Sequence, residues 1–201
     1  KRLTNRYEAG VLTGKGLAYG GSRARKEAEG YGATYFVQRM LERTGSGLDG
    51  KKVVVSVSGN VALYTIEKVH SFGGRVIAAS DSSGYVVDES GIDLDLLKDV
   101  KEVRRERISE YAKARGVSVR FIAGGSIWDV PCDVAMPSAT QNVLTGNDAQ
   151  MLVSNGVKAV GEGANMPSTP DAVRVFQQAG VLFAPGKAAN AGGVATSVLE
   201  M

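Results

Sequence analysis

The segment 51–80 constrains the fold of this chain most, because it carries the signals of a strand, a glycine turn, a helix and a second strand in succession. Residues 51–57 contain the β-branched run Val53-Val54-Val55, which is typical of a buried parallel strand. A helix is predicted from about 60 to 72, and a second strand at 75–80. Such a βαβ unit predicts two parallel strands with a helix packed against them.

The pattern continues to the end of the chain and predicts an α/β fold, with a doubly wound, mostly parallel, Rossmann-like sheet. Its ligand site is expected at the carboxyl ends of the strands. A hairpin or turn is expected at 82–92 and a charged, solvent-facing helix at 93–115. Further strands are predicted at 117–122, 132–136, 157–160 and 181–184, and further helices near 145–154 and 169–179.

We expect residues 1–201 to form a single dinucleotide-binding domain, a size that suits one large domain. It divides into an N-terminal helical segment (1–44), a Rossmann core (51–184) and the start of a C-terminal helix (185–201). The chain begins at Lys1 without an initiator Met, so we expect a domain excised from a longer protein.

Composition excludes several classes of function. The 24 basic and 21 acidic residues give a net charge of +3, which is too balanced to suggest a nucleic-acid or membrane partner. The only cysteine, Cys132, allows no intrachain disulfide, and the sequence has no clustered ligand set for a metal. No apolar run approaches the roughly 18 residues of a membrane span. We expect a cytoplasmic protein with a reduced thiol.

The first strand-to-helix turn partly matches the phosphate-binding pattern G-x-G-x-x-G/A. The second glycine is Gly59 and the last small residue is Ala62, but Val57 occupies the first glycine position. Gly59 would let a pyrophosphate approach the helix N-terminus, and Asp81, 22 residues later, stands where a ribose-binding acid is expected. The same turn also suits ordinary α/β packing, and the pattern leaves both interpretations open.

Val57 argues against binding, since a β-branched residue is stiff and unfavourable at positive φ. Its methyl groups would also point towards the ribose of a cofactor. In the alternative interpretation, Val57 only extends the first strand by one apolar residue.

Several longer motifs, in the same order along the chain, resemble those of glutamate dehydrogenases. They lie at 7–16, 19–22, 58–62, 137–142, 161–167 and 185–194. The resemblance covers essentially all of the chain, and the last two motifs are the most specific. It implies a two-domain, usually hexameric enzyme that interconverts glutamate with 2-oxoglutarate and ammonia by hydride transfer to a nicotinamide cofactor. The family's catalytic lysine lies in the other domain, so no catalytic residue is assigned here.

The resemblance also implies roles for individual residues, in order along the cofactor. The pyrophosphate would be faced by Ser58, Gly59, Asn60 and Val61, and the adenosine ribose by Asp81 and Ser82. Ala139 and Thr140 would line the cofactor path, Asn165 and Asn190 would lie near the nicotinamide, and Val194 and Ser197 would border the substrate pocket. From the residues alone, Asn165 and Asn190 could equally be Asx-turn residues of glycine-rich loops.

The cofactor is expected to be NADP, with NAD as the alternative. Ser82 and Ser83 could hydrogen-bond a 2′-phosphate, and a basic run could supply positive charge, namely Lys101, Arg104 and Arg105. Such a run is also typical of a solvated helix face.

Departures from the family cluster near the start of the chain, at Arg23, Lys26 and Glu29, with Val143 as a further one. Glu29 stands where the family usually has Thr, and its charge would repel a polyanionic ligand. Polar residues here suit a surface exposed by removal of a partner domain, which suggests an engineered, excised domain.

Two functions follow. The first is a cofactor-binding domain of an NADP-dependent oxidoreductase, inactive alone. The second is an engineered, non-catalytic scaffold or assembly module, a monomer or dimer in which Val57 and Glu29 impair nucleotide binding. An unrelated Rossmann-like binder such as a methyltransferase is disfavoured by the motifs at 161–167 and 185–194.

Overall fold

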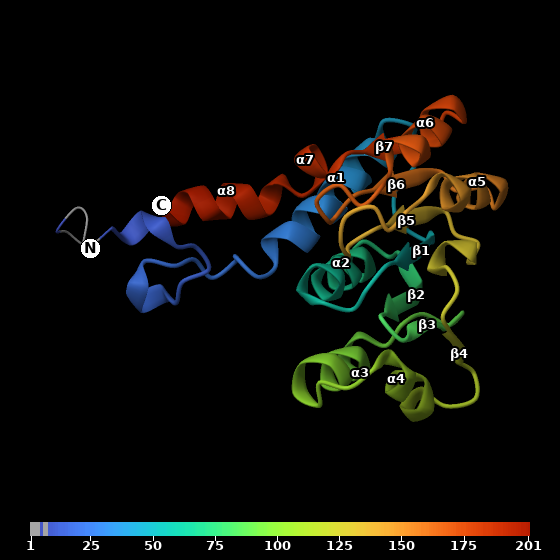
Figure 1. Cartoon of the computed structure of the whole chain (residues 1–201), viewed down its shortest axis with the longest axis horizontal. Coiled ribbons are helices and arrows are strands. Elements are labelled where there is room, and N and C mark those ends of the chain that lie inside the picture. The colour runs from blue at the N-terminus through green and yellow to red at the C-terminus, as the bar shows by residue number, and fades with distance from the viewer. Residues whose placement is uncertain (1–4, 6–7) are drawn as a thin grey trace.

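The computed structural model describes residue 5 and residues 8–201, so the predicted 1–44 segment is described only in part. Within the described residues, seven strands form one sheet in the order β4-β3-β2-β1-β5-β6-β7 (Figure 1). The strands are β1 (Lys52–Val55), β2 (Arg75–Asp81), β3 (Gly84–Val87), β4 (Arg120–Ala123), β5 (Val134–Met136), β6 (Ala159–Gly161) and β7 (Leu182–Ala184).

The sheet confirms the predicted α/β, doubly wound and mostly parallel fold. Strand β1 pairs in parallel with β2 on one side and β5 on the other, and β6 and β7 continue the parallel order. Strands β3 and β4 run antiparallel and form one edge. The chain order reverses beside β1, and such a switch point is where doubly wound sheets open a crevice for a ligand.

Helices cover both faces of the sheet. On one face lie α1 (Ala28–Glu42), α2 (Asn60–Ser71), α3 (Leu94–Lys98) and α4 (Ile108–Arg115), and on the other lie α5 (Gly146–Ser154) and α6 (Pro170–Gln178). The side chains of β1 alternate between the two faces of the sheet and so contribute to both cores. Val53 and Val55 point into the first core and Val54 into the second. All three side chains are fully buried.

The predicted single helix at 93–115 is wrong, because the chain breaks there. Helix α3 is followed by a π-helical turn (Asp99–Val103), and Arg105 adopts a φ of +56° before α4 begins. The backbone N–H of Ile108 donates to the Asp81 carboxylate at 2.8 Å, which fixes the restart of the helix. One side of the segment is buried, with Leu97 and Tyr111 in the first core, whereas residues 102–107 are exposed, so the segment is solvent-facing only in part.

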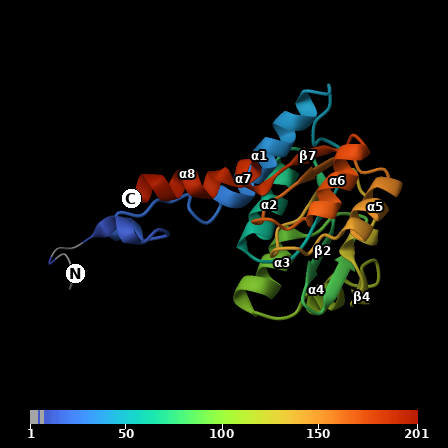
Figure 2. The same cartoon turned by 45° about the horizontal axis from the view of Figure 1, so that its top comes forward.

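An extension projects from the sheet (Figures 1 and 2). Helix α7 (Gly186–Ala189) leads into α8 (Ala191–Glu200), which runs beside residues 10–25. The buried Glu200 carboxylate joins the two, because it accepts hydrogen bonds from Ser22 Oγ at 2.7 Å, Ser22 N at 2.8 Å and Gly14 N at 2.6 Å. The Ser22 hydrogen bonds, with those from the backbone, lower the pKa of Glu200 to about 2.

The part of the chain that the structure describes contains no helix long and apolar enough to cross a membrane.

Candidate functional site

A large opening lies at the switch point, over the carboxyl ends of β1, β2 and β5. It is a cavity of about 920 Å³. Its wall combines the turn after β1, the end of β2, the segment 124–128 and the loop after β5. The lining residues are Ser56, Val57, Ser58, Gly59, Ser80, Asp81, Ser82, Gly84, Tyr85, Lys101, Gly124, Gly125, Ser126, Ile127, Trp128, Ala139, Thr140, Val143 and Asp148.

Val57 has the strained backbone that its place in the motif predicts. Its φ is +71°, a region that glycine enters freely and a β-branched residue rarely does. The strain is on the order of 1–3 kcal/mol. Its N–H donates to Ser80 Oγ at 2.8 Å, which ties the turn to β2. The side chain also forms part of the cavity wall.

Ser58 and Gly59 form the floor of the cavity at the start of α2. The Ser58 side chain is 3% exposed, and its hydroxyl has no hydrogen-bond partner among the described residues. Gly59 is the N-cap of α2 without a side-chain cap, and a Cβ placed there would have no heavy atom within 4 Å. Asn60 and Val61 open the helix. An uncapped helix N-terminus facing open space is suited to an anion.

The Asp81 carboxylate accepts four hydrogen bonds from the described part of the chain, at the other side of the cavity. It accepts from Ser83 N at 2.8 Å, Ser83 Oγ at 2.6 Å, Lys101 Nζ at 2.9 Å and Ile108 N at 2.8 Å. Burial alone would raise the pKa of Asp81, but these donors outweigh it and lower the pKa to about 2. Asp81 is therefore ionised at neutral pH and organises the β2–β3 turn and the restart of α4.

Arg107 is a residue at this site that the sequence pattern missed. Its guanidinium donates to Ser82 Oγ. Of the predicted basic residues, Lys101 reaches the cavity, whereas Arg104 pairs with Asp99 at 2.9 Å and Glu106 at 3.0 Å. No local signal separated Arg107 from its neighbours, because its direction depends on the chain break between η3 (Asp99–Val103) and α4.

Ala139 and Thr140, in the loop after β5, connect the large cavity to a second one. This second cavity has a volume of about 420 Å³ and is lined by Ala139, Thr140, Gln141 and Asn165. Asn165 in turn borders a third cavity of about 210 Å³ between α1 and α8. The lining of the third cavity is Arg25, Glu29, Asn165, Asn190, Gly193, Val194, Ser197, Val198 and Met201. The first and second cavities therefore share two lining residues, and the second and third share one.

Asn165 and Asn190 are brought together from two different loops. The Asn190 side-chain amide donates to Asn165 Oδ1 at 2.8 Å and to the carbonyl of Gly163 at 3.3 Å. These partners lie 25 and 27 residues away in the sequence, so the hydrogen bonds of Asn190 do not form the local Asx turn considered above.

Glu29 lies in the third cavity, at the opposite end of the series from Asp81. Its carboxylate pairs with Arg25 Nη1 at 3.1 Å, and Arg25 Nε donates to Ser197 Oγ at 3.0 Å. The negative charge that the sequence suggested is therefore partly compensated. Arg23 and Lys26 are exposed, whereas Val143 lines the first cavity.

The family model for glutamate/leucine/phenylalanine/valine dehydrogenases matches residues 20–201. The chain is 57% identical over 204 residues to the NADP-specific glutamate dehydrogenase of Escherichia coli strain K12, and 54% identical over 208 residues to that of Helicobacter pylori strain J99. Both alignments cover all of this chain but only 45% and 46% of those proteins.

Among solved structures, glutamate dehydrogenase from Plasmodium falciparum matches with a TM-score of 0.92 and 43% identity. That match covers 100% of this chain and 43% of the other. The chain thus spans less than half the length of the relatives it resembles. The family match and these identities together show that the chain belongs to the glutamate/leucine/phenylalanine/valine dehydrogenase family.

Proposed function

We propose that residues 1–201 act as a single dinucleotide-binding domain that takes NADP along the three cavities, with NAD as the weaker ligand. The observation that carries this proposal is that neighbouring cavities share lining residues, namely Ala139 and Thr140 between the first and second, and Asn165 between the second and third. An extended dinucleotide needs such a path along the carboxyl ends of parallel strands. One end of the ligand would lie at Asp81 and Ser82, and the other at Asn165 and Asn190.

The turn after β1 would hold the pyrophosphate. The unpartnered, buried hydroxyl of Ser58 and the open space at Gly59 support this assignment. A phosphate oxygen would supply the missing partner for Ser58, and the first N–H groups of α2, from Asn60 and Val61, favour negative charge.

The preference for NADP rests on positive charge beside the β2–β3 turn. Arg107 contacts Ser82, and Lys101 contacts Asp81, so two cations stand close to where a 2′-phosphate would extend from the ribose. Guanidinium groups suit phosphate well because they offer paired donors in one plane. The relatives from E. coli and H. pylori are themselves named as NADP-specific.

The complete enzyme would transfer hydride between NADP and glutamate, or 2-oxoglutarate with ammonia, in the cytoplasm and as a hexamer. Val194 and Ser197 would face its substrate. We propose that this chain alone is inactive, as a monomer or dimer, because hydride transfer requires both reactants to be held together.

A second candidate is a non-catalytic assembly module with impaired nucleotide binding. Two observations favour it: the strained Val57 in the wall of the first cavity, and the Arg25–Glu29 pair inside the third. In this case the fold would persist without its ligand.

Titration of NADPH fluorescence with the purified chain and with Val57→Gly tests these candidates. Saturable binding by Val57→Gly supports the cofactor role, whereas no saturable binding by either chain contradicts it and favours the assembly module. A parallel assay should detect no glutamate-dependent reduction of NADP by the chain alone. Turnover above the enzyme-free background would contradict the proposed inactivity.

A further inference from the structure

Glu162 follows the last residue of β6 and is a carboxylate inside the protein. Its side chain is 4% exposed. One carboxylate oxygen accepts a hydrogen bond from Ser168 N at 3.1 Å, and the other accepts from Gly186 N at 2.7 Å. Ser168 lies in the loop between β6 and α6, while Gly186 begins α7 after β7. Glu162 therefore joins two loops that are distant in the sequence.

Packing alone does not explain a carboxylate at this position. A buried charge is unfavourable unless its oxygens accept strong hydrogen bonds, and an apolar side chain of similar size would fill the space without that penalty. The two recorded partners of Glu162 are both backbone amides, whose positions define the course of the loops. A carboxylate offers a separate acceptor oxygen to each of the two N–H donors, whereas Gln of the same length offers only one acceptor oxygen.

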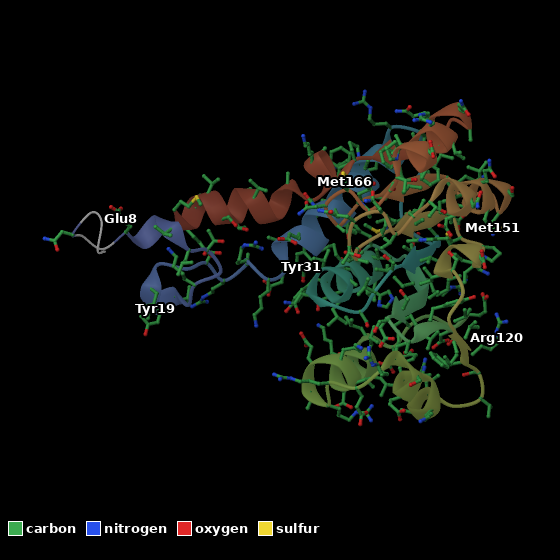
Figure 3. The ribbon with its side chains drawn as sticks, in the orientation of Figure 1. Glu8, Tyr19, Tyr31, Arg120, Met151 and Met166 are labelled. Carbon is green, nitrogen blue, oxygen red and sulfur yellow. The ribbon has the colours of Figure 1, made fainter. Side chains whose placement is uncertain are left out.

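The β6–α6 loop also has a strained backbone that needs such support. Met166 adopts a φ of +53° although the residue is 56% exposed, so burial does not offset the cost of this conformation. Figure 3 shows Met166 close to α7. Its carbonyl accepts from Asn142 N at 3.1 Å, and Glu162 holds the chain two residues further on, at Ser168. Strained backbone persists only where the surrounding contacts fix it.

The amide pair Asn165–Asn190 lies within the two loops that Glu162 joins. Asn165 stands between Glu162 and Ser168, and Asn190 follows Gly186 by four residues. Their 2.8 Å hydrogen bond forms where the second and third cavities meet. A relative shift of the two loops would separate the pair without any change in the strands.

We propose that Glu162 is a positioning residue that holds Asn165 and Asn190 together at the far end of the ligand path. The role of Glu162 in binding the nicotinamide half rests on the function proposed above. The effect of Glu162 on the Asn165–Asn190 pair is independent of that function.

The test compares the wild-type chain with Glu162→Gln, Glu162→Asp and the control Ser168→Ala. Gln offers one acceptor oxygen and a donor group, so it leaves at least one backbone amide unpaired. Asp keeps the charge with a shorter reach. Ser168→Ala removes a buried hydroxyl that has no partner among the described residues, yet keeps the N–H that Glu162 binds.

Amide hydrogen exchange and the side-chain NH₂ signals of the two asparagines are measured by NMR on the ligand-free chains. In both Glu162 variants, exchange at Gly186 should accelerate about tenfold or more, and the Asn190 NH₂ signals should shift, while strand β5 stays protected. Ser168→Ala should match the wild type. Unchanged Asn190 signals, or equal acceleration throughout the sheet, would overturn the proposal.

Ligand binding then separates this inference from the proposed function. Glu162→Gln should weaken NADPH about tenfold and leave the affinity for adenosine 2′,5′-bisphosphate within about twofold. Equal weakening of both ligands contradicts the positioning role. If neither ligand binds the wild-type chain or Val57→Gly, the proposed function fails, and the asparagine signals still decide the role of Glu162.

Discussion

The turn after β1 and the loops after β6 and β7 all lie at the carboxyl ends of parallel strands, yet they differ in how far the protein satisfies its own polar groups. In the turn, Ser58 has a buried hydroxyl without a partner and Gly59 leaves α2 uncapped. In the loops, the Glu162 carboxylate and the Asn190 amide each have two protein partners. The two regions therefore differ at their charged and amide side chains and at the helix N-terminus, while a buried hydroxyl without a described partner occurs in both, at Ser58 and at Ser168.

This difference separates two roles. Groups that already have partners hold the backbone in place, whereas the uncapped N-terminus of α2 leaves backbone N–H groups for a ligand in the cavity. Backbone strain occurs in both regions, at Val57 and at Met166, so strain alone does not distinguish them. Four substitutions test this comparison.

The largest effect is expected from Val57→Gly, which removes both the strained φ and the methyl groups in the cavity wall. The affinity for NADPH should increase about thirtyfold, by about 2 kcal/mol, because the methyl groups leave the cavity wall, as measured by fluorescence titration. Met166→Gly is the matched control, because it relieves a similar φ without opening a cavity. It should bring no gain in affinity. An equal gain in both variants, or none in Val57→Gly, would show that Val57 does not obstruct the turn.

Asp81→Asn tests a carboxylate at the first cavity whose oxygens already accept hydrogen bonds from the protein. The pKa of Asp81 is lowered to about 2 from 3.8, so its stabilising contribution is full above about pH 4 and is lost as the pH falls towards 2. Asp81→Asn should lower the free energy of unfolding at pH 7 by about 1–2 kcal/mol, after allowance for solvent screening, and should flatten its dependence between pH 4 and 2.

Urea denaturation at a series of pH values measures this effect. Asp171→Asn is the control, since its carboxylate is exposed and pairs with Arg174 on the same helix. The control should change stability by less than about 0.5 kcal/mol. An Asp81→Asn chain with wild-type stability and pH dependence would show that the hydrogen bonds to the Asp81 carboxylate do not stabilise the fold.

Ser58→Ala tests the unsatisfied group directly. The free chain should lose no stability, because the hydroxyl has no partner to lose, while NADPH affinity in the Val57→Gly background should fall by about 1 kcal/mol. Ser168→Ala, which removes another buried unpartnered hydroxyl, should leave affinity unchanged. Thermal melts and the same titration measure both. A loss of stability with unchanged affinity would assign Ser58 to the fold.

The smallest effect is expected from Glu29→Gln, because Arg25 already compensates the charge. NADPH affinity should rise two- to threefold, by about 0.5 kcal/mol, and the gain should shrink with added salt. Glu42→Gln removes the same charge at the other end of α1 and should have no effect. A gain that is equal in both variants, or independent of salt, would exclude local repulsion by Glu29.

Local signals in the sequence determined most of the architecture. The β-branched run at 53–55, the glycine turn after it and the helix at 60–71 specify a βαβ unit without reference to distant residues, because each signal acts within a few positions. The positive φ of Val57 also follows from its place in the motif. The later motifs gave the candidate residues Asn165 and Asn190, but not their contact.

Only the tertiary structure decided how the separate segments complete one another. The helix expected at 93–115 breaks where Lys101 and Ile108 N both donate to Asp81, 20 and 27 residues away, and Arg107 beside this break donates to Ser82. Likewise, Glu162 meets Gly186 only once β6 and β7 pair. Hydrogen bonds between distant segments have no periodicity along the chain, so the sequence pattern cannot reveal them, and they set the geometry of the candidate site.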